Sequence, residues 1–214
     1  NNGEIICFDK QIKKIGTYSN MLLGNPSYID ALDPFRVIVY YPNTQSVVLL
    51  NNRVTEISKP TLLSEKGITD ASLVCRSVRG GFWVLDRANW AILHLDSGFN
   101  LTGEKIMLDL NFSGSKPLFM QENNGLLYVA FMGKAICRFD QFGARMGDIL
   151  IKIDNYFTII DGSIIYQTKE EIYQYNIENN QILPFDLSIK CIPAKVQGQF
   201  LYFDGRTLSV DKIR

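Results

Sequence analysis

One short pattern recurs along the chain: two or three apolar residues in strand-like alternation, followed by Asp or Asn. The closing residues of its six copies are Asp9, Asn51, Asp96, Asp140, Asn176 and Asp211. They are 42, 45, 44, 36 and 35 residues apart. This spacing is the length of one four-stranded blade of a β-propeller. The repeat therefore predicts an all-β chain folded as a six-bladed β-propeller, with about four antiparallel strands per blade.

A second pattern lies upstream of most copies: a turn with Gly or Pro leads into an aromatic-rich strand, as in Gly81–Leu85 and Gly162–Tyr166. Continuous apolar runs of this kind are typical of strands covered on both faces, as an inner blade strand is. A more polar segment follows each Asp or Asn and is predicted to be the outer strand. Asp and Asn favour the intervening turn because their side chains bond to their own backbone.

These patterns place the blades at about residues 3–19, 27–59, 73–108, 117–150, 156–186 and 189–213, within a single domain over 1–214. The chain enters at a third strand, so we expect the N-terminal blade to be incomplete. A closed ring needs its first and last blades to meet. We therefore expect further chain upstream of Asn1, or a partner strand, to fill the gap. Helix content should be near zero, with one helical turn around Ser64–Gly67.

The charge balance narrows the class of partner. Lys and Arg number 22, Asp and Glu also number 22, and the formal net charge is zero. A neutral chain lacks the usual electrostatic footprint of a nucleic-acid binder and has no long-range attraction to an anionic membrane. No stretch approaches the roughly 18 apolar residues of a membrane-spanning helix. We expect no nucleic-acid partner and no direct membrane insertion.

The four cysteines do not form a metal or redox motif. Cys7, Cys75, Cys137 and Cys191 are 68, 62 and 54 residues apart, and no CxxC is present. Each falls in a predicted strand, where a thiol behaves as a small apolar group. Buried free thiols are the favoured interpretation; a disulfide and a reactive nucleophile are the alternatives.

His94 is the only histidine, so any Ser-His-Asp triad would have to include it. Its strand parity places it between blades or toward the surface, which favours a structural role over that of a catalytic base.

The segment Asp109–Ser113 alternates oxygen ligands but lacks the glycine and distal Glu of an EF-hand loop. We interpret it as a polar connection between blades.

A central metal site of the lactonase type would need several carboxylates or amides converging from the inner strands. The nearest acids are Asp30, Glu122 and Asp161, and we interpret all three as ordinary turn residues. The sequence therefore predicts no catalytic residue, no metal and no cofactor, and we expect a protein that is not an enzyme.

One loop face is a candidate partner-binding surface. Trp, Tyr, Arg and Met are enriched at protein interfaces, and the loops between second and third strands are predicted to carry the following residues: Tyr41, Pro42, Arg87, Trp90, Phe131, Met132 and Arg206. The interblade loops Asn20–Ser27 and Pro60–Ala71 add apolar residues to the same face. The alternative is that these apolar residues plug the wedges between blades.

Five segments resemble, in the same order along the chain, segments of a known protein family. They are Leu22–Pro26, Asp33–Arg36, Gln45–Asn52, Ala71–Cys75 and Gly81–Asp86. The chain is similar in these segments to exported six-bladed propellers of Gram-negative bacteria with type IX secretion. It is similar in kind to the Plug subunit that closes the periplasmic side of the outer-membrane translocon. The resemblance implies a precursor with an export signal, a periplasmic location and a protein partner such as that translocon. It supplies no catalytic motif.

Three functions follow as hypotheses. The first is a non-enzymatic protein-interaction propeller in the bacterial cell envelope, with the translocon plug as its sharpest form. The second is a small-ligand or glycan-binding propeller, which needs an exposed aromatic platform and would be weakened if Trp83 and Trp90 were both buried. The third is a metal-dependent lactonase or hydrolase, which needs three or more ligands converging on a metal.

Overall fold

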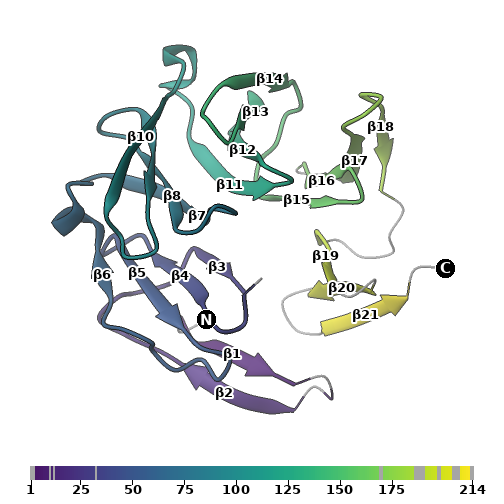
Figure 1. Ribbon diagram of the computed structural model, residues 1–214. Helices are drawn as coiled ribbons and strands as arrows, with labels where there is room; N and C mark the ends of the chain where they lie inside the picture. Colours follow the sequence, from purple (N-terminus) through teal and green to yellow (C-terminus); the bar gives the residue numbers. More distant parts are fainter. Residues whose placement is uncertain are drawn as a thin grey trace. The chain divides into compact units, whose positions relative to one another are not determined.

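The computed structural model describes residues 3–9, 11, 13–31, 33–168, 171–185, 191–196, 199–203 and 208–212. These residues form antiparallel sheets, with only two short 3-10 helices among them (Figure 1). The all-β fold with several four-stranded antiparallel sheets agrees with the sequence prediction. The number of blades stays a prediction, as does the single domain.

The chain separates into two compact units. The first unit comprises Asn1–Ser113 with Met120–Gly125. Its strands and 3-10 helices are β1 (Ile5–Phe8), β2 (Lys14–Tyr18), β3 (Tyr28–Asp30), β4 (Val37–Tyr41), β5 (Ser46–Leu50), β6 (Thr61–Leu62), η1 (Leu63–Lys66), β7 (Ala71–Arg76), β8 (Phe82–Asp86), β9 (Ala91–Leu95), β10 (Leu101–Met107) and η2 (Leu110–Phe112). They make one two-stranded sheet, β1-β2, and two four-stranded sheets, β3-β4-β5-β6 and β7-β8-β9-β10.

The second unit comprises Gly114–Phe119 with Leu126–Arg214, so β11 contributes residues to both units. The remaining strands are β11 (Pro117–Asn123), β12 (Leu126–Phe131), β13 (Ala135–Asp140), β14 (Arg145–Ile149), β15 (Phe157–Ile160), β16 (Ser163–Gln167), β17 (Ile172–Asn176), β18 (Ile182–Pro184), β19 (Ala194–Val196), β20 (Gln199–Phe203) and β21 (Leu208–Lys212). They form the sheets β11-β12-β13-β14, β15-β16-β17-β18 and β19-β20-β21.

The core of each unit lies between sheets, against the second and third strands. Every residue of β4, β5 and β8 is buried, as expected for strands that are covered on both faces. In the first unit, alternate residues of β4 and β5 enter two different apolar clusters, so one strand packs on both of its faces. An apolar cluster in the second unit includes Ile164 and Phe157.

At four of its six positions, the recurring Asp or Asn stands at the end of a strand and caps the turn that follows. One Oδ1 atom accepts two backbone N–H groups, two and four residues further along. Asp96 accepts from Gly98 and Asn100, each over 2.8 Å. Asn51 accepts from Arg53 over 2.9 Å and from Thr55 over 3.1 Å. Asp9 and Asp140 make the same pair of bonds. The sequence repeat is therefore a repeat of turn chemistry, as predicted.

The same turn requires a residue with a left-handed backbone conformation three positions after the capping Asp or Asn. That residue is Val54, Phe99 or Gly143, with φ values of 52°, 65° and 85°. A positive φ is uncommon for non-glycine residues and is held here by burial of the side chain. Val54 and Phe99 both lie in core clusters, so core packing compensates for the strained backbone.

Two local predictions need adjustment. The outer strand expected directly after Asn51 is reduced to an isolated bridge between Leu50 and Glu56, and the ladder continues as β6 at Thr61–Leu62. The helical turn predicted near Ser64 is present as η1 and ends at Gly67, whose φ of 80° allows its N–H to bond back into the turn.

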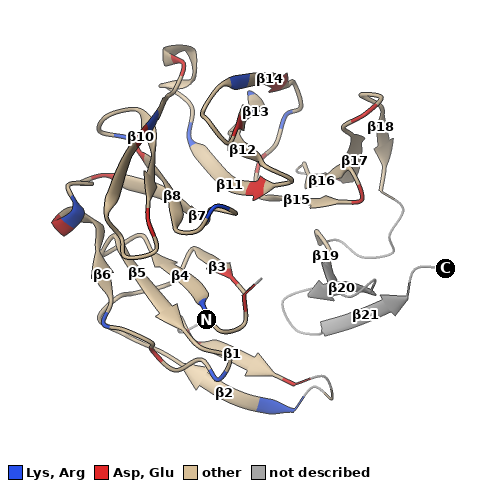
Figure 2. Cartoon of the chain, in the orientation of Figure 1, with Lys and Arg blue, Asp and Glu red and all other residues tan. Residues whose placement is uncertain are grey.

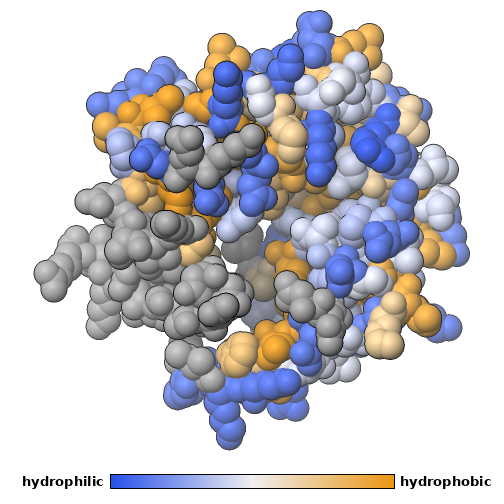
Figure 3. All heavy atoms as spheres, turned by 180° about the vertical axis from the view of Figure 1, so that it is seen from behind, coloured by the Kyte–Doolittle hydropathy of each residue, from blue (hydrophilic) through white to orange (hydrophobic). Residues whose placement is uncertain are grey.

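Charged residues of both signs are interspersed along the described chain, without a long segment of one sign (Figure 2). Hydrophobic and hydrophilic side chains also alternate over the face shown in Figure 3. No helix in the described residues is long and apolar enough to cross a membrane.

Candidate functional site

The predicted partner-binding residues fall into two groups. Tyr41 and Phe131 end strands β4 and β12, and both side chains are fully buried. Each side chain packs inside its unit, so neither offers exposed area, and the expectation that they lie on an exposed face needs correction. Strand pairing explains this: Tyr41 pairs with Ser46 and Phe131 with Ala135, which makes both residues part of the ladder rather than of the loop.

The remaining predicted residues are partly or fully exposed. Arg87 is exposed and forms an ion pair of 2.8 Å with Asp70. Trp90 is half-buried, and its indole Nε1 donates to the Asp109 carbonyl over 3.0 Å. Pro42 is half-buried and Met132 is exposed. Arg206 lies outside the described residues. Partner binding by these residues stays a prediction.

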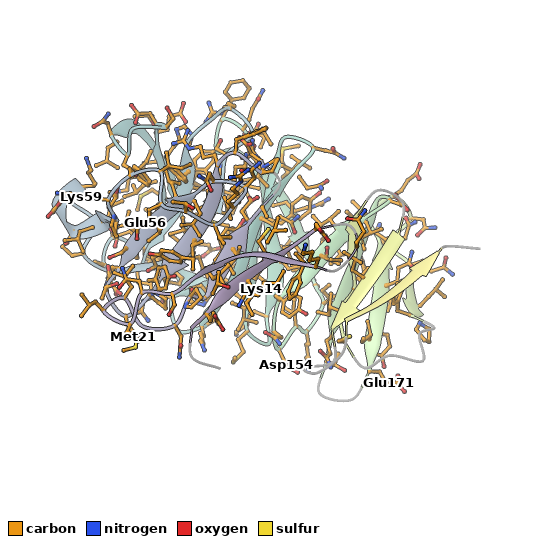
Figure 4. The ribbon with its side chains drawn as sticks, turned by 90° about the horizontal axis from the view of Figure 1, so that it is seen from below. Lys14, Met21, Glu56, Lys59, Asp154 and Glu171 are labelled. Carbon is orange, nitrogen blue, oxygen red and sulfur yellow. The ribbon has the colours of Figure 1, made fainter. Side chains whose placement is uncertain are left out.

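The most exposed apolar side chains in the predicted loops belong to the turn Asn20–Leu23. Met21 and Leu22 are 87% and 89% exposed, whereas Leu23 is buried in the core cluster beside β4 and β5. Leu23 N–H donates to the Asn20 carbonyl over 3.1 Å, and Leu22 N–H donates to Asn20 Oδ1 over 3.2 Å. The turn thus holds two apolar side chains at its tip, and Met21 points away from the ribbon in Figure 4.

This turn lies against the loop that carries Pro42. A Cβ atom on Gly24 would come within 2.8 Å of Asn43 Nδ2, so the two loops are in close contact. Of the predicted loop leucines, Leu23 and Leu63 are buried plugs, and Leu62 is exposed. The interpretation as plugs between blades therefore holds for Leu23 and Leu63, and partner binding by the exposed side chains stays a prediction. We call the segment Asn20–Leu23 the apolar turn.

His94 contacts the backbone, a threonine and, at 3.7 Å from its Nδ1, the Glu104 carboxylate. Its Nε2 lies 3.1 Å from the Gly80 carbonyl, which only accepts, so Nε2 carries a proton. Its Nδ1 lies 3.2 Å from Thr102 Oγ1. The ring packs edgewise on Trp83, with centroids 4.7 Å apart. These contacts are those of a buried structural residue.

The acids on the inner strands are not all turn residues, and this corrects the sequence interpretation. Asp161 is exposed at a turn with φ of 48°, as expected. Asp30 and Glu122 instead lie within strands and are buried. The Tyr28 hydroxyl donates to Asp30 Oδ2 over 3.2 Å. Glu122 Oε2 accepts from Trp83 Nε1 over 2.7 Å and from Val78 N–H over 3.1 Å.

Two groups that face these acids are held in their neutral forms. Burial raises the pKa of the Cys75 thiol well above its ordinary value, and the charges of Glu122 and Asp30 raise it further. Burial, followed by Cys75 and Asp30, likewise raises the pKa of Tyr28. A thiol that stays protonated is a poor nucleophile. Among the described residues, no three His, Cys, Asp or Glu side chains are grouped so that they could hold a metal ion.

The oxygen-rich segment is a connection, as predicted, whereas the prediction of buried thiols holds for two cysteines and not for Cys7 and Cys191, which are half-buried. All four cysteines are free, with Cys75 and Cys137 buried. Asp109 caps η2, where its Oδ1 accepts from Asn111 N–H over 2.9 Å. A carboxylate used as a helix cap explains this segment without calcium.

Sequence reasoning missed a groove of about 720 Å³ in the first unit. Its lining comes from the turn before β4, the segment leading to β6, η1 and the turn after β9. Arg36, Lys59 and Lys66 are among its residues. They are 23 and 7 residues apart in the sequence, a spacing that follows no motif, so only the folded chain brings them to one groove.

Comparison with known proteins supports the fold. No protein-family model matches the chain, and no curated protein matches it. A catalytically inactive variant of virginiamycin B lyase from Staphylococcus aureus, solved with quinupristin, is 18% identical with a TM-score of 0.64, over 98% of this chain and 70% of the lyase chain. A protein of unknown function from Bacteroides caccae is 10% identical with a TM-score of 0.62, over 94% and 82% of the two chains.

A third similar structure is the extracellular domain of a one-component system from B. thetaiotaomicron. It is 15% identical with a TM-score of 0.56, over 86% of this chain and 26% of that one. Identities this low show a β-propeller-like fold and carry no information on activity. They give no support to the resemblance to type IX secretion propellers, which stays a prediction.

Proposed function

We propose that this chain is a non-enzymatic propeller of the bacterial cell envelope that binds a protein partner through its loops. The observation that carries the proposal is the apolar turn. Met21 and Leu22 are almost fully exposed, yet their backbone is fixed by Asn20 and anchored by buried Leu23. A pre-organised apolar tip loses little conformational entropy on binding, which is the property of an interface anchor.

A non-enzymatic role is supported by the structural contacts that the buried titratable groups make. His94 contacts Thr102 and the Gly80 carbonyl, and Glu122 contacts Trp83. Burial opposes ionisation of the Cys75 thiol by raising its pKa. Catalytic groups need access to substrate and a suitable protonation state. These groups instead make contacts that hold neighbouring strands and turns together.

The sharper form of the proposal is a periplasmic plug of the type IX translocon. Its support is the resemblance of the five segments from Leu22 to Asp86, one of which begins within the apolar turn. In this form the apolar turn contacts an integral outer-membrane protein. The alternative, glycan binding, is less well supported because Trp83 is buried and the indole N–H of Trp90 already donates to the Asp109 carbonyl.

The test is co-purification of the tagged full-length protein from its native membranes in mild detergent, followed by mass spectrometry. The Met21→Ser/Leu22→Ser variant is compared with the wild type and with Leu110→Ser, a matched control at an exposed leucine of η2. We expect one large outer-membrane protein with the wild type and the control, and its loss with the double variant. Recovery of the wild type alone, or equal recovery with all three proteins, would overturn the proposal.

A further inference from the structure

The floor of the groove in the first unit is rigid and apolar. Leu49 of β5 and Phe99 line it, and both are buried in the same core cluster. The Phe99 ring stacks on Phe82 with centroids 4.5 Å apart and planes within 10°. The floor is therefore fixed by the core of two sheets and keeps its shape without a ligand.

The rim of the groove carries an excess of positive charge. Arg36, Lys59 and Lys66 line it, against a single acid, Glu65. No carboxylate of the described residues lies within ion-pair distance of any of the three cations. Lys59 projects outward in Figure 4. This local excess contrasts with the zero net charge of the whole chain, so the groove is an electrostatically distinct place on the surface.

Arg36 is pre-positioned for an anion. Its guanidinium lies 5.4 Å from the centroid of the Phe82 ring and donates from one terminal nitrogen to the Ser97 carbonyl. A guanidinium has five N–H donors in a fixed plane, so one backbone bond leaves others for a carboxylate. The nearby Asp96 carboxylate accepts hydrogen bonds from Gly98 N–H and from the backbone and side chain of Asn100, and its charge also acts on Lys66. Arg36 and Lys59 are therefore the cations of the rim that Asp96 offsets least.

Two apolar side chains lie beside these cations in open positions. Phe35 is 71% exposed and Ile57 is 51% exposed, and both line the groove. The groove thus combines a cationic rim with apolar surface that the folded chain leaves in water. That combination complements a ligand bearing both carboxylates and apolar groups.

We propose that this groove binds an acidic peptide segment of the protein partner. Glutamate or aspartate side chains of the segment contact Arg36, Lys59 and Lys66, and an apolar side chain covers Phe35 and Ile57. The volume of about 720 Å³ falls in the range of ligand sites and suits a few residues of extended chain. This inference rests on the proposed function for the origin of the peptide, but it adds a second contact with its own chemistry.

The experiment measures fluorescence anisotropy of a labelled hexapeptide of alternating glutamate and leucine, titrated with the full chain. We expect binding that weakens as salt is raised, because exposed charges are screened. Each of Lys59→Gln and Lys66→Gln should weaken binding about two- to five-fold. Ile57→Ser should weaken it as well. Lys105→Gln, at an exposed lysine of β10 outside the groove, should leave the affinity unchanged.

The matched peptide of alternating glutamine and leucine should bind at least ten-fold more weakly. Equal binding of the two peptides, or an equal loss with Lys105→Gln, would overturn the proposal. Full displacement of the peptide by free succinate or phosphate would also overturn it and assign the groove to a small anion. The apolar turn is not part of this measurement, so failure of the membrane co-purification and failure of peptide binding can be told apart.

Discussion

The indole Nε1 of Trp83 donates a hydrogen bond to Glu122 Oε2 over 2.7 Å, and this bond joins β8 to β11, strands of two different sheets. The same oxygen accepts from Val78 N–H in the turn that follows β7. The second oxygen, Oε1, is buried and has no hydrogen-bond partner among the described residues. One buried carboxylate oxygen therefore satisfies two donors that the core would otherwise leave without an acceptor.

Removal of this carboxylate should destabilise the first unit. Glu122→Ala leaves the Trp83 indole N–H buried without an acceptor, at a cost of about 1–3 kcal/mol in the free energy of unfolding. Glu122→Gln keeps an acceptor oxygen and should cost less. Urea denaturation followed by tryptophan fluorescence measures both values. Glu65→Gln, at an exposed acid of η1, is the control and should change stability by less than about 0.5 kcal/mol. Equal stability of the alanine and glutamine variants would contradict the role of the bond.

Neighbouring tyrosines of β4 offer a second comparison. The Tyr40 hydroxyl donates to the Ala71 carbonyl over 2.7 Å, whereas the Tyr41 hydroxyl is buried with no hydrogen-bond partner among the described residues. Tyr40→Phe should therefore cost about 1 kcal/mol, and Tyr41→Phe should be neutral or stabilising. Thermal unfolding of the two variants gives the comparison. A larger loss for Tyr41→Phe would mean that its hydroxyl has a partner that the structure does not contain.

The repeat could be predicted because its chemistry is local. Asp96 and the residues whose N–H groups it binds lie within four positions of one another, so the spacing of such residues in the sequence directly reports the turn. The burial of Glu122 could not be predicted in this way. Its partner Trp83 lies 39 residues away, and strand parity alone does not distinguish an acid at a strand end from an acid bonded to the next sheet.

The predicted partner-binding residues show a second limit of prediction from the sequence. Tyr41 and Phe131 are the last residues of their strands, and an error of one or two positions in a strand end moves a side chain from the loop into the core. The apolar turn was identifiable because Met21 and Leu22 follow a strand and precede Gly and Pro. The groove was not, since its residues come from five segments that only the fold brings together.

Adjacent glycines in the turn between β7 and β8 should tolerate substitution very differently. Both have positive φ, 89° for Gly80 and 79° for Gly81. A Cβ on Gly80 would meet no atom within 4 Å, so Gly80→Ala should cost only the backbone strain of about 1–2 kcal/mol. A Cβ on Gly81 would lie 2.0 Å from the Leu95 carbonyl oxygen, which requires movement of β9.

Gly81→Ala should therefore cost roughly 4 kcal/mol or more, or prevent folding of the first unit. The free energies of unfolding of the two alanine variants, with yield in the soluble fraction as a second readout, provide the measurement. Gly80→Ala serves as the internal control because it has the same backbone conformation and the same added atom. Similar losses for the two variants would show that strain alone, and not the contact with Leu95, sets the cost.

Alkaline pH should destabilise the first unit through groups that are buried in neutral form. Burial raises the pKa of the Cys75 thiol well above its ordinary 9.0, and burial followed by the charge of Asp70 raises the pKa of Tyr40 to about 12. In the unfolded chain these groups lose their protons at ordinary pH values. Their contribution to stability is therefore complete below about pH 9 and is lost progressively as pH rises toward the folded pKa values.

We expect the free energy of unfolding to be nearly constant from pH 7 to 8.5 and to fall above pH 9, with a slope of up to about 1.4 kcal/mol per pH unit for each such group. Urea denaturation at fixed ionic strength measures this profile. Cys75→Ala removes the thiol, so the decline should begin about one pH unit higher, where unfolded tyrosines ionise. Cys7→Ala is the control, because Cys7 is only partly buried, and it should leave the onset unchanged. A profile that stays flat to pH 11, or the same onset in the wild type and Cys75→Ala, would contradict the assignment of the alkaline transition to Cys75.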